Sequence, residues 1–298
     1  MSATVGRAPP RTSVRMASTT VERPFSVRIR RPSSRASATS LSRWAITSSA
    51  NSTGLSGNAS TPLTVALLVA IPGESPYREG MESSNDLEFF FDPICPFAWV
   101  TSRWVEEVVK LRGITVEWKF IALEIVNEDT DYSKFPPAYP ALHGLGRRLL
   151  RVAAAARAEG GNDAVAAFYT AAGERMHHEG VSVAVFGGEP IPESLIAEVI
   201  ASAGLDASLV AAADDESWDE LLRAETEQSL GRTGRDVGTP ILTFAPGTTK
   251  EASLFGPVIS SIPRGDAALE LWDAVQTLAR TPGFAELKRS MRDPLSFD

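Results

Sequence analysis

The only cysteine of the 298-residue chain, Cys95, stands where a thiol could do chemistry. A short aromatic run, residues 87–91, comes shortly before it, and Pro96 opens a stretch with helical spacing. Proline suits the first position of a helix, because the N–H that it lacks would have no partner there. A sulfur at that point faces free N–H groups and the positive end of the helix dipole, which stabilise a thiolate. The spacing therefore favours a nucleophilic thiol over the commoner fate of a lone cysteine, a small buried apolar side chain.

A second unusual position is Pro240, which opens a predicted strand, residues 240–244. Proline removes a hydrogen-bond donor from a sheet, so its place at the start of a strand needs a reason. A cis peptide bond between Thr239 and Pro240 would supply one, because it turns the unbonded edge toward the sulfur to receive a substrate backbone or thiol. The alternative is an ordinary proline between a loop and a strand.

The apolar pattern predicts the elements that must hold these two positions. Residues 87–91 and 114–121 are expected to form strands, and residues 100–111 carry apolar side chains at helical spacing and end at Gly113. The order strand, helix, strand favours a parallel pair. The remaining predicted elements are the two strands of a hairpin and a last helix: residues 240–244, 253–255 and 266–280.

A long stretch between the second and third strands is rich in Ala, Leu and Glu and poor in helix breakers. The helices predicted there are residues 142–158, 163–177, 194–203 and 218–231. The whole order is βαβ, a helical block, and then ββα. The predicted fold class is therefore α/β: a thioredoxin-like domain over residues 85–298, with a helical insertion at about residues 136–235.

Residues 1–84 differ in composition from the rest of the chain. Residues 1–80 contain ten Arg and no Lys against three Glu, and their apolar residues show no sustained period. Such a segment cannot bury enough apolar surface to offset its ordering entropy, so we predict a disordered N-terminal extension. Three interpretations stay open: a presequence of the organellar type, a plain tail, and an upstream-start artefact in which translation begins at Met81.

Composition argues against several function classes. The chain has 29 Lys and Arg against 37 Asp and Glu, a net charge of −8 at pH 7, which argues against nucleic-acid binding. A single Cys excludes an internal disulfide, and with only three His it leaves little room for a metal centre. The apolar run in the N-terminal segment is too short to span a bilayer, so no membrane partner is expected.

From about residue 86 to its end, the sequence resembles the DsbA-like branch of the thioredoxin superfamily, and within it the mycothiol-dependent nitroreductase family. It also resembles 2-hydroxychromene-2-carboxylate isomerases and kappa-class glutathione transferases. The segments that carry the resemblance are residues 91–104, 126–128, 236–240, 255–259, 262–274, 286–289 and 297–298. The resemblance implies a cytoplasmic enzyme that takes mycothiol or another low-molecular-weight thiol as co-substrate, needs neither metal nor flavin, and allows a homodimer.

The chain departs from that family at the last position of the motif. The family pattern is Cys-Pro-Trp-Cys, whereas this chain has Cys95, Pro96, Phe97 and Ala98, followed by Trp99. Without a resolving cysteine, an oxidised Cys95 must become a sulfenic acid or a mixed disulfide with an external thiol. Phe97 should still offer an apolar face to a flat substrate, and Trp99 is either a core residue or a wall of the pocket.

The resemblance assigns two further residues to the site. Asn127 matches a position beside the family's active site that can hydrogen-bond cofactor or substrate, and its alternative role is a loop cap. His177 matches a histidine that faces the family's pocket, and its alternative role is a partner of the helix dipole. Thr239 and Pro240 complete the predicted set of thiol- and substrate-binding residues.

These residues predict a thiol-dependent oxidoreductase in which Cys95 and a mycothiol-type thiol reduce small electrophilic or nitro-aromatic molecules. Two alternatives stay open. The first is an isomerase or transferase of the kappa-class type, which uses bound thiol without redox cycling. The second is a thioredoxin-fold binding module in which Ala98 marks lost catalysis.

Overall fold

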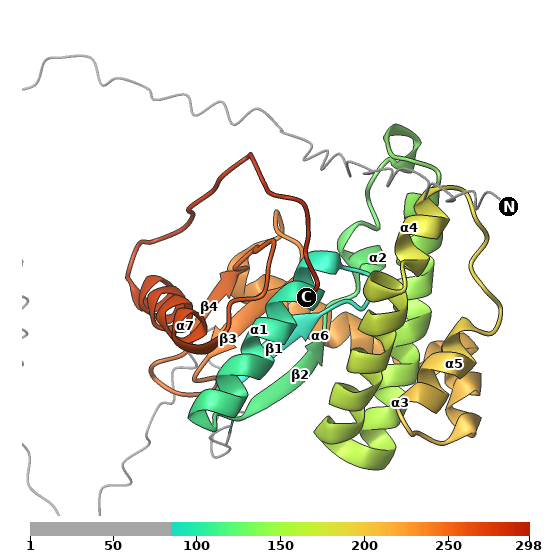
Figure 1. The fold of residues 1–298 in the computed structure, drawn as a ribbon, viewed down its shortest axis with the longest axis horizontal. Helices are drawn as coiled ribbons and strands as arrows, with labels where there is room; N and C mark the ends of the chain where they lie inside the picture. The colour runs from blue at the N-terminus through green and yellow to red at the C-terminus, as the bar shows by residue number, and fades with distance from the viewer. Residues whose placement is uncertain (1–84) are drawn as a thin grey trace, which may run out of the picture. The chain divides into compact units, whose positions relative to one another are not determined.

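The computed structural model describes residues 85–298, and the predicted extension, presequence and alternative start at Met81 lie outside this range. Its sheet has four strands in the order β2-β1-β3-β4 (Figure 1). As predicted, β1 (Leu87–Phe91) and β2 (Val116–Phe120) are parallel. β3 (Ile241–Phe244) is antiparallel to β1, and β4 (Ala252–Phe255) forms the predicted hairpin with β3.

Two helices pack together on one face of this sheet. α1 (Pro96–Arg112) connects β1 with β2, and α7 (Gly265–Arg280) follows β4. The indole N–H of Trp104 on α1 donates to the carbonyl oxygen of Ala268 on α7 at 2.9 Å. The ring of Trp104 also lies 5.8 Å from that of Trp272 on α7, between centroids. These contacts fix the direction of α1, and with it the place of its first turn.

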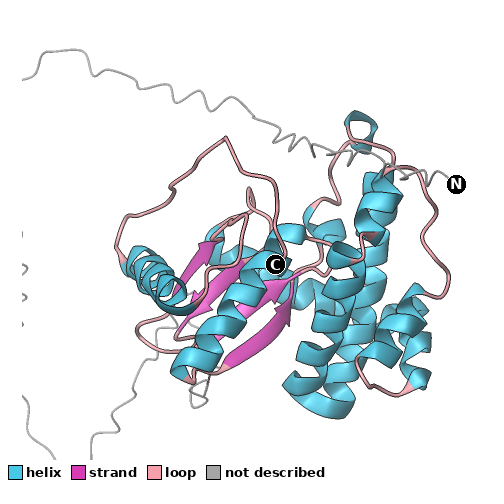
Figure 2. Cartoon of the chain, viewed as in Figure 1, coloured by secondary structure: helices cyan, strands magenta, loops and turns pink. Residues whose placement is uncertain are grey.

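The opposite face of the sheet is covered by α6 (Asp219–Thr233). Leu230 of this helix packs against Phe90 of β1 and Ile241 of β3, whose side chains point away from α1 because neighbouring residues of a strand alternate between faces. Figure 2 shows the sheet between these helices and the helical block beside it. The order βαβ followed by ββα, with helices on both faces, is the thioredoxin-like arrangement that the sequence predicts.

The chain between β2 and α6 is helical. Its helices are α2 (Leu123–Val126), α3 (Ala138–Gly173), α4 (Val181–Phe186) and α5 (Leu195–Ser202), with 3₁₀ turns at Tyr132–Lys134, Ala207–Asp214 and Glu216–Trp218. The two helices predicted for residues 142–158 and 163–177 join in α3, across a break at Gly161 with φ 68°. A π-helical turn, Glu174–His178, follows α3. The sequence did not predict α2, α4 and the 3₁₀ turns, because segments this short show no helical period.

Side chains of α3 and α6 complete the outer edge of β2. Beyond the break in α3, the side-chain oxygen of Asn162 accepts from the amide of Trp118 at 2.9 Å, and its amide donates to the carbonyl of Val116 at 2.8 Å. From α6, the carboxylate of Glu225 accepts from the amide of Phe120 at 2.8 Å. These bonds occupy backbone groups that an edge strand would otherwise leave unpaired.

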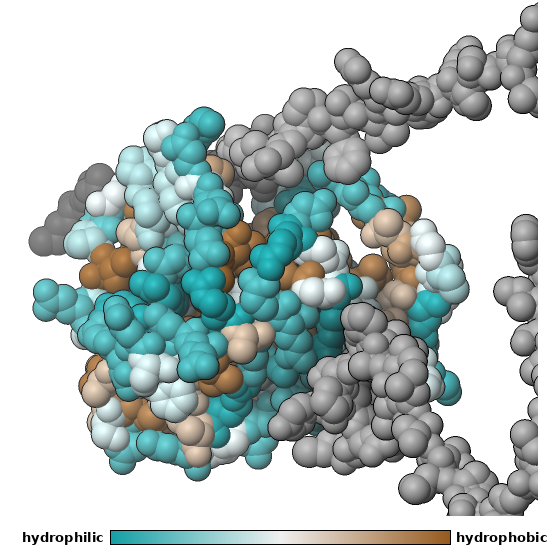
Figure 3. Space-filling view, turned by 180° about the vertical axis from the view of Figure 1, so that it is seen from behind, coloured by the Kyte–Doolittle hydropathy of each residue, from teal (hydrophilic) through white to brown (hydrophobic). Residues whose placement is uncertain are grey.

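The surface seen in Figure 3 is mainly hydrophilic, with small separate hydrophobic areas. The large apolar side chains that are exposed are Leu111, Val183, Val210, Phe255, Leu287 and Met291. Single exposed apolar residues are ordinary on a protein surface. Among residues 85–298, no helix is both long enough and apolar enough to cross a lipid bilayer.

Candidate active site

The sulfur of Cys95 lies at the N-terminal end of α1, as the sequence predicts. Cys95 is the N-cap residue, with Pro96 in the first turn, and its carbonyl oxygen accepts from the amide of Trp99 at 3.1 Å. Its Sγ accepts from the backbone N–H of Ala98 at 3.5 Å. The thiol in turn donates to the carbonyl oxygen of Thr239, 3.4 Å away. Two segments far apart in the sequence therefore meet at the sulfur.

The bond between Thr239 and Pro240 is cis, as predicted. Thr239 is buried, and its hydroxyl donates to the backbone carbonyl of Phe90 at 3.0 Å. The carbonyl of Pro240 accepts from the amide of Gly256 at 2.8 Å. The start of β3 is thus tied to the strands on both sides of it, which holds the Thr239 carbonyl against Cys95.

The expectation of a lowered thiol pKa is wrong for this conformation. Cys95 is 8% exposed, and burial raises the pKa of its thiol to about 12. The amides of Ala98 and Phe97 lower the pKa, as the helix end should, but the cost of desolvating a thiolate is larger. The negative charge of Asp92 raises the pKa further. Cys95 is therefore a protonated thiol here, and a thiolate requires that the site be uncovered.

Asp92 is a residue of this site that was not predicted. One carboxyl oxygen accepts from the amide of Ile94 at 3.2 Å, and the other accepts from the amide of Leu123 at 2.8 Å. Asp92 is fully buried, and burial raises its pKa to about 7 despite these bonds. Gly146 of α3 passes so close that a Cβ there would lie 2.7 Å from the carboxyl group. The available signal was an acidic residue directly after three consecutive phenylalanines, residues 89–91.

His177 and Trp99 form a buried pair behind the Cys95 loop. Nε2 of His177 lies 2.9 Å from the carbonyl oxygen of Pro93, which can only accept, so the ring donates. Burial lowers the pKa of His177 to about 4, which leaves the ring neutral at neutral pH. Trp99 is 1% exposed and stacks on His177 with 6.1 Å between centroids, and the guanidinium of Arg103 lies over its ring. Of its two predicted roles, Trp99 has the core role in this structure.

The other predicted residues differ in their surroundings. Phe97 is half-buried in the first turn of α1, whereas Ala98 is fully buried. Asn127 follows α2 and its side-chain amide donates to the carbonyl of Leu123 at 2.7 Å, which is the loop-cap role. Contact of Asn127 with a cofactor stays a prediction.

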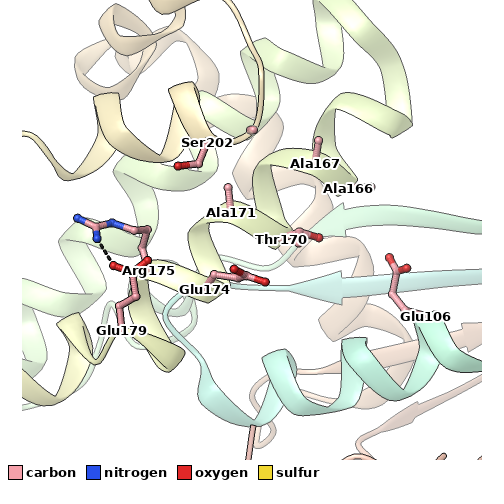
Figure 4. Close-up of a pocket in the computed structure, with 10 residues that line it drawn as sticks. Glu106, Ala166, Ala167, Thr170, Ala171, Glu174, Arg175, Glu179 and Ser202 are labelled. Carbon is pink, nitrogen blue, oxygen red and sulfur yellow. Dashed lines mark hydrogen bonds and ion pairs between the residues drawn. The ribbon is translucent and has the colours of Figure 1, made fainter. Parts of the chain in front are cut away.

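A cavity of about 510 Å³ lies elsewhere in the fold, where α1, α3 and α5 meet (Figure 4). Its lining includes Glu106 from α1, Ala171 from α3 and Ser202 from α5. Arg175, also in the lining, forms ion pairs with Glu179 and Glu198. None of the predicted site residues lines this cavity, so it adds nothing to the site at Cys95.

Comparison with known proteins shows to which family the chain belongs. The model of the Rv2466c-like family, described as mycothiol-dependent nitroreductase Rv2466c, matches residues 94–289. The chain is also 32% identical over 204 residues to the uncharacterized protein Rv2286c of Mycobacterium tuberculosis (strain ATCC 25618 / H37Rv), an alignment that covers 68% of this chain and 81% of that protein.

Solved structures that match the chain include a 2-hydroxychromene-2-carboxylate isomerase, at 20% identity and a TM-score of 0.41 over 65% of this chain and 96% of that one. A candidate protein disulfide isomerase from Nitrosomonas europaea has 12% identity and a TM-score of 0.41 over 64% and 97%. Likeness at this level carries no argument about function. The family match, by contrast, spans more than half of the chain and includes both Cys95 and the Thr239–Pro240 bond. The chain therefore belongs to the Rv2466c-like family of mycothiol-dependent nitroreductases.

Proposed function

We propose that this protein is a cytoplasmic thiol-dependent oxidoreductase, in which Cys95 and a mycothiol-type thiol reduce a small electrophilic or nitro-aromatic molecule. The observation that carries the proposal is the place of the sulfur, 3.5 Å from the amide nitrogen of Ala98 at the start of α1 and 3.4 Å from the carbonyl of Thr239. Once deprotonated, the sulfur keeps the amide as a donor to its charge. The cytoplasm fits this chemistry because its low-molecular-weight thiols are kept reduced.

Two-electron reduction of a nitro group consumes two thiols. Cys95 and one cofactor thiol each give up a hydrogen, the nitro group loses one oxygen as water and becomes a nitroso group, and a bond forms between the two sulfurs. A second cofactor thiolate then attacks this mixed disulfide, which releases the oxidised cofactor and returns Cys95 as a thiol. Ala98 supports this order of events, because the motif has no second cysteine to expel the cofactor.

The other site residues take positioning roles in this proposal. Phe97 offers the apolar face for a flat substrate, and Thr239 and Pro240 hold the thiol partner beside Cys95. His177, neutral at neutral pH, holds the loop before Cys95 through its bond to Pro93. Asn127 is proposed to bind the thiol cofactor from the end of α2. The partners are thus a small thiol and an electrophile.

The test is the intact mass of the protein after incubation with mycothiol disulfide, with glutathione disulfide, or with neither. We expect one mycothiol adduct on the wild-type chain and none on Cys95→Ser. A wild-type chain that takes up no thiol contradicts the proposal and favours the binding-module alternative. Uptake of glutathione without uptake of mycothiol would show that the protein uses glutathione and would contradict the choice of mycothiol.

Product analysis separates the proposal from the isomerase or transferase alternative, which the single cysteine also permits. Net reduction of a nitro-aromatic substrate, with mycothiol disulfide formed in step, supports the oxidoreductase. A substrate that is isomerised or conjugated while no disulfide forms supports the kappa-class alternative instead.

A further inference from the structure

Residues 281–298, called the tail here, leave α7 and return to the start of α1 without forming a helix or strand (Figure 1). Most of the tail hardly packs on the domain: residues 285–294 are exposed, and the side chains of Leu287 and Met291 are 77% and 89% exposed. Phe284, near the start of the tail, and residues 295–297 are half-buried. The contacts between the tail and the rest of the domain are therefore concentrated at the C-terminal end of the tail.

The end of the tail is held by three kinds of contact. The amide of Ser296 donates to the carbonyl oxygen of Ser260 at 2.8 Å. The ring of Phe297 lies against the rings of His177 and His178, with centroids 5.8 and 5.5 Å apart. Leu295 and Phe297 also pack against the main hydrophobic core.

These contacts reach the residues on both sides of Cys95. His177, under Phe297, is bonded to the carbonyl of Pro93 just before the motif. On the other side, the guanidinium of Arg292 lies over the ring of Phe97, 5.1 Å from its centroid. The tail thus crosses the motif whose thiol is 8% exposed.

We propose that the tail is an internal occupant of the substrate site: Phe297 holds the place of a substrate's aromatic ring on His177 and His178, and such a ring binds by displacing the tail. The separation of these rings is that of ordinary aromatic pairs, so a nitro-aromatic ring can make the same contacts. A segment with so few buried contacts can open while the domain stays folded. The aromatic nature of the substrate rests on the proposed function, whereas the opening of the tail does not.

The test compares Phe297→Ala with Met291→Ala, a control in the same tail at an exposed residue. The readout is the rate at which iodoacetamide alkylates Cys95 in the full chain, measured at several pH values. We expect Phe297→Ala to raise this rate by at least about fivefold, and Met291→Ala to leave it unchanged. Arg292→Ala removes the contact of the tail with Phe97 and should raise the alkylation rate by a smaller factor. This variant keeps the proposal testable if Phe297→Ala fails to fold.

Nitrobenzene provides the second arm. We expect it to protect Cys95 from alkylation, at a lower half-protecting concentration in Phe297→Ala than in the wild type, because the tail no longer competes. Equal alkylation rates in all four chains overturn the role of the tail, and a failure of nitrobenzene to protect any of them overturns the assignment of the aromatic site. Neither readout needs mycothiol or turnover, so faster alkylation without a mycothiol adduct would reject the proposed function and keep the tail inference.

Discussion

The thiol of Cys95 donates to the carbonyl oxygen of Thr239 at 3.4 Å, although the two residues are 144 positions apart in the chain. That contact depends on a second one, because the buried hydroxyl of Thr239 donates to the carbonyl of Phe90 at 3.0 Å. Phe90 belongs to β1, the strand that leads to Cys95. The same strand therefore determines the positions of both partners.

Replacing Thr239 with Val should test this coupling. The two side chains have nearly the same shape, but Val cannot donate to the Phe90 carbonyl, so the folded state should lose about 1–3 kcal/mol in urea unfolding. Thr277→Val is the matched control, because the Thr277 hydroxyl is exposed and bonds within its own helix. It should change stability by less than about 0.5 kcal/mol. Equal effects of the two substitutions would mean that the Thr239 hydroxyl does not hold the site.

Ala98→Cys should restore a dithiol motif. The amide of residue 98 lies 3.5 Å from the sulfur of Cys95, one helical turn along, so a side-chain sulfur at this position can reach Cys95. On mild oxidation we expect the intact mass to fall by two hydrogen atoms and both thiols to resist alkylation. Ser102→Cys is the control, since the buried Ser102 lies a further turn along α1 and its thiol should stay free. Two free thiols in oxidised Ala98→Cys would contradict the arrangement.

Asp92 should make stability depend on pH. Its pKa is raised from 3.8 to about 7, so the folded state prefers the protonated form. The stability that protonation contributes is complete in acid below the unfolded pKa and is lost as the pH rises through the folded one. Between about pH 5 and pH 8, the wild type should lose about 2 kcal/mol relative to Asp92→Asn, which cannot titrate.

Urea unfolding across this range is the measurement for Asp92. Asp273→Asn serves as the control, because Asp273 is an exposed carboxyl whose pKa is lowered by its bond to Arg112. Asp273 therefore titrates below this pH range, and the difference in unfolding free energy between wild type and Asp273→Asn should not change with pH. If the difference in unfolding free energy between wild type and Asp92→Asn also did not change with pH, Asp92 would be ionised throughout the range.

The parts of the site that were predictable are those set by neighbours in the sequence. An apolar run followed by Cys95 and Pro96 is sufficient to predict a strand, a loop and a helix start, because each signal acts within one turn of backbone. Pro240, directly before β3, was informative about the site because the effect of a proline on a strand is also local in the sequence. The meeting of Cys95 with Thr239 was expected from a proline at the start of a strand, whose unbonded edge would turn toward the sulfur.

Burial was not predictable in this way. The helix end at Cys95 lowers the pKa of its thiol locally, but burial sets the net direction of the shift. The carbonyl oxygen beside the sulfur comes from Thr239, which is 144 residues away in the chain. Asp92 illustrates the same point, because burial raises its pKa and Gly146, which passes close to its carboxyl group, lies far along the chain. Likewise, nothing local to Phe297 indicates that its ring meets His177.

Gly173 provides the sharpest test of how the helical block supports the site. A Cβ at this position would lie 2.1 Å from ring atoms of the buried Trp99, so Gly173→Ala must push α3 away from α1. We expect a loss of at least about 3 kcal/mol in urea unfolding, at the upper end of overpacking costs. The π-helical turn begins at the next residue, so His177 should also move, and NMR titration should show its pKa rising from about 4 toward the ordinary 6.5. Gly144→Ala is the control in the same helix, since a Cβ there meets nothing within 4 Å, and it should gain up to about 1 kcal/mol. If both variants were equally stable and His177 kept its low pKa, the contact between Trp99 and α3 would not be what holds the histidine behind the Cys95 loop.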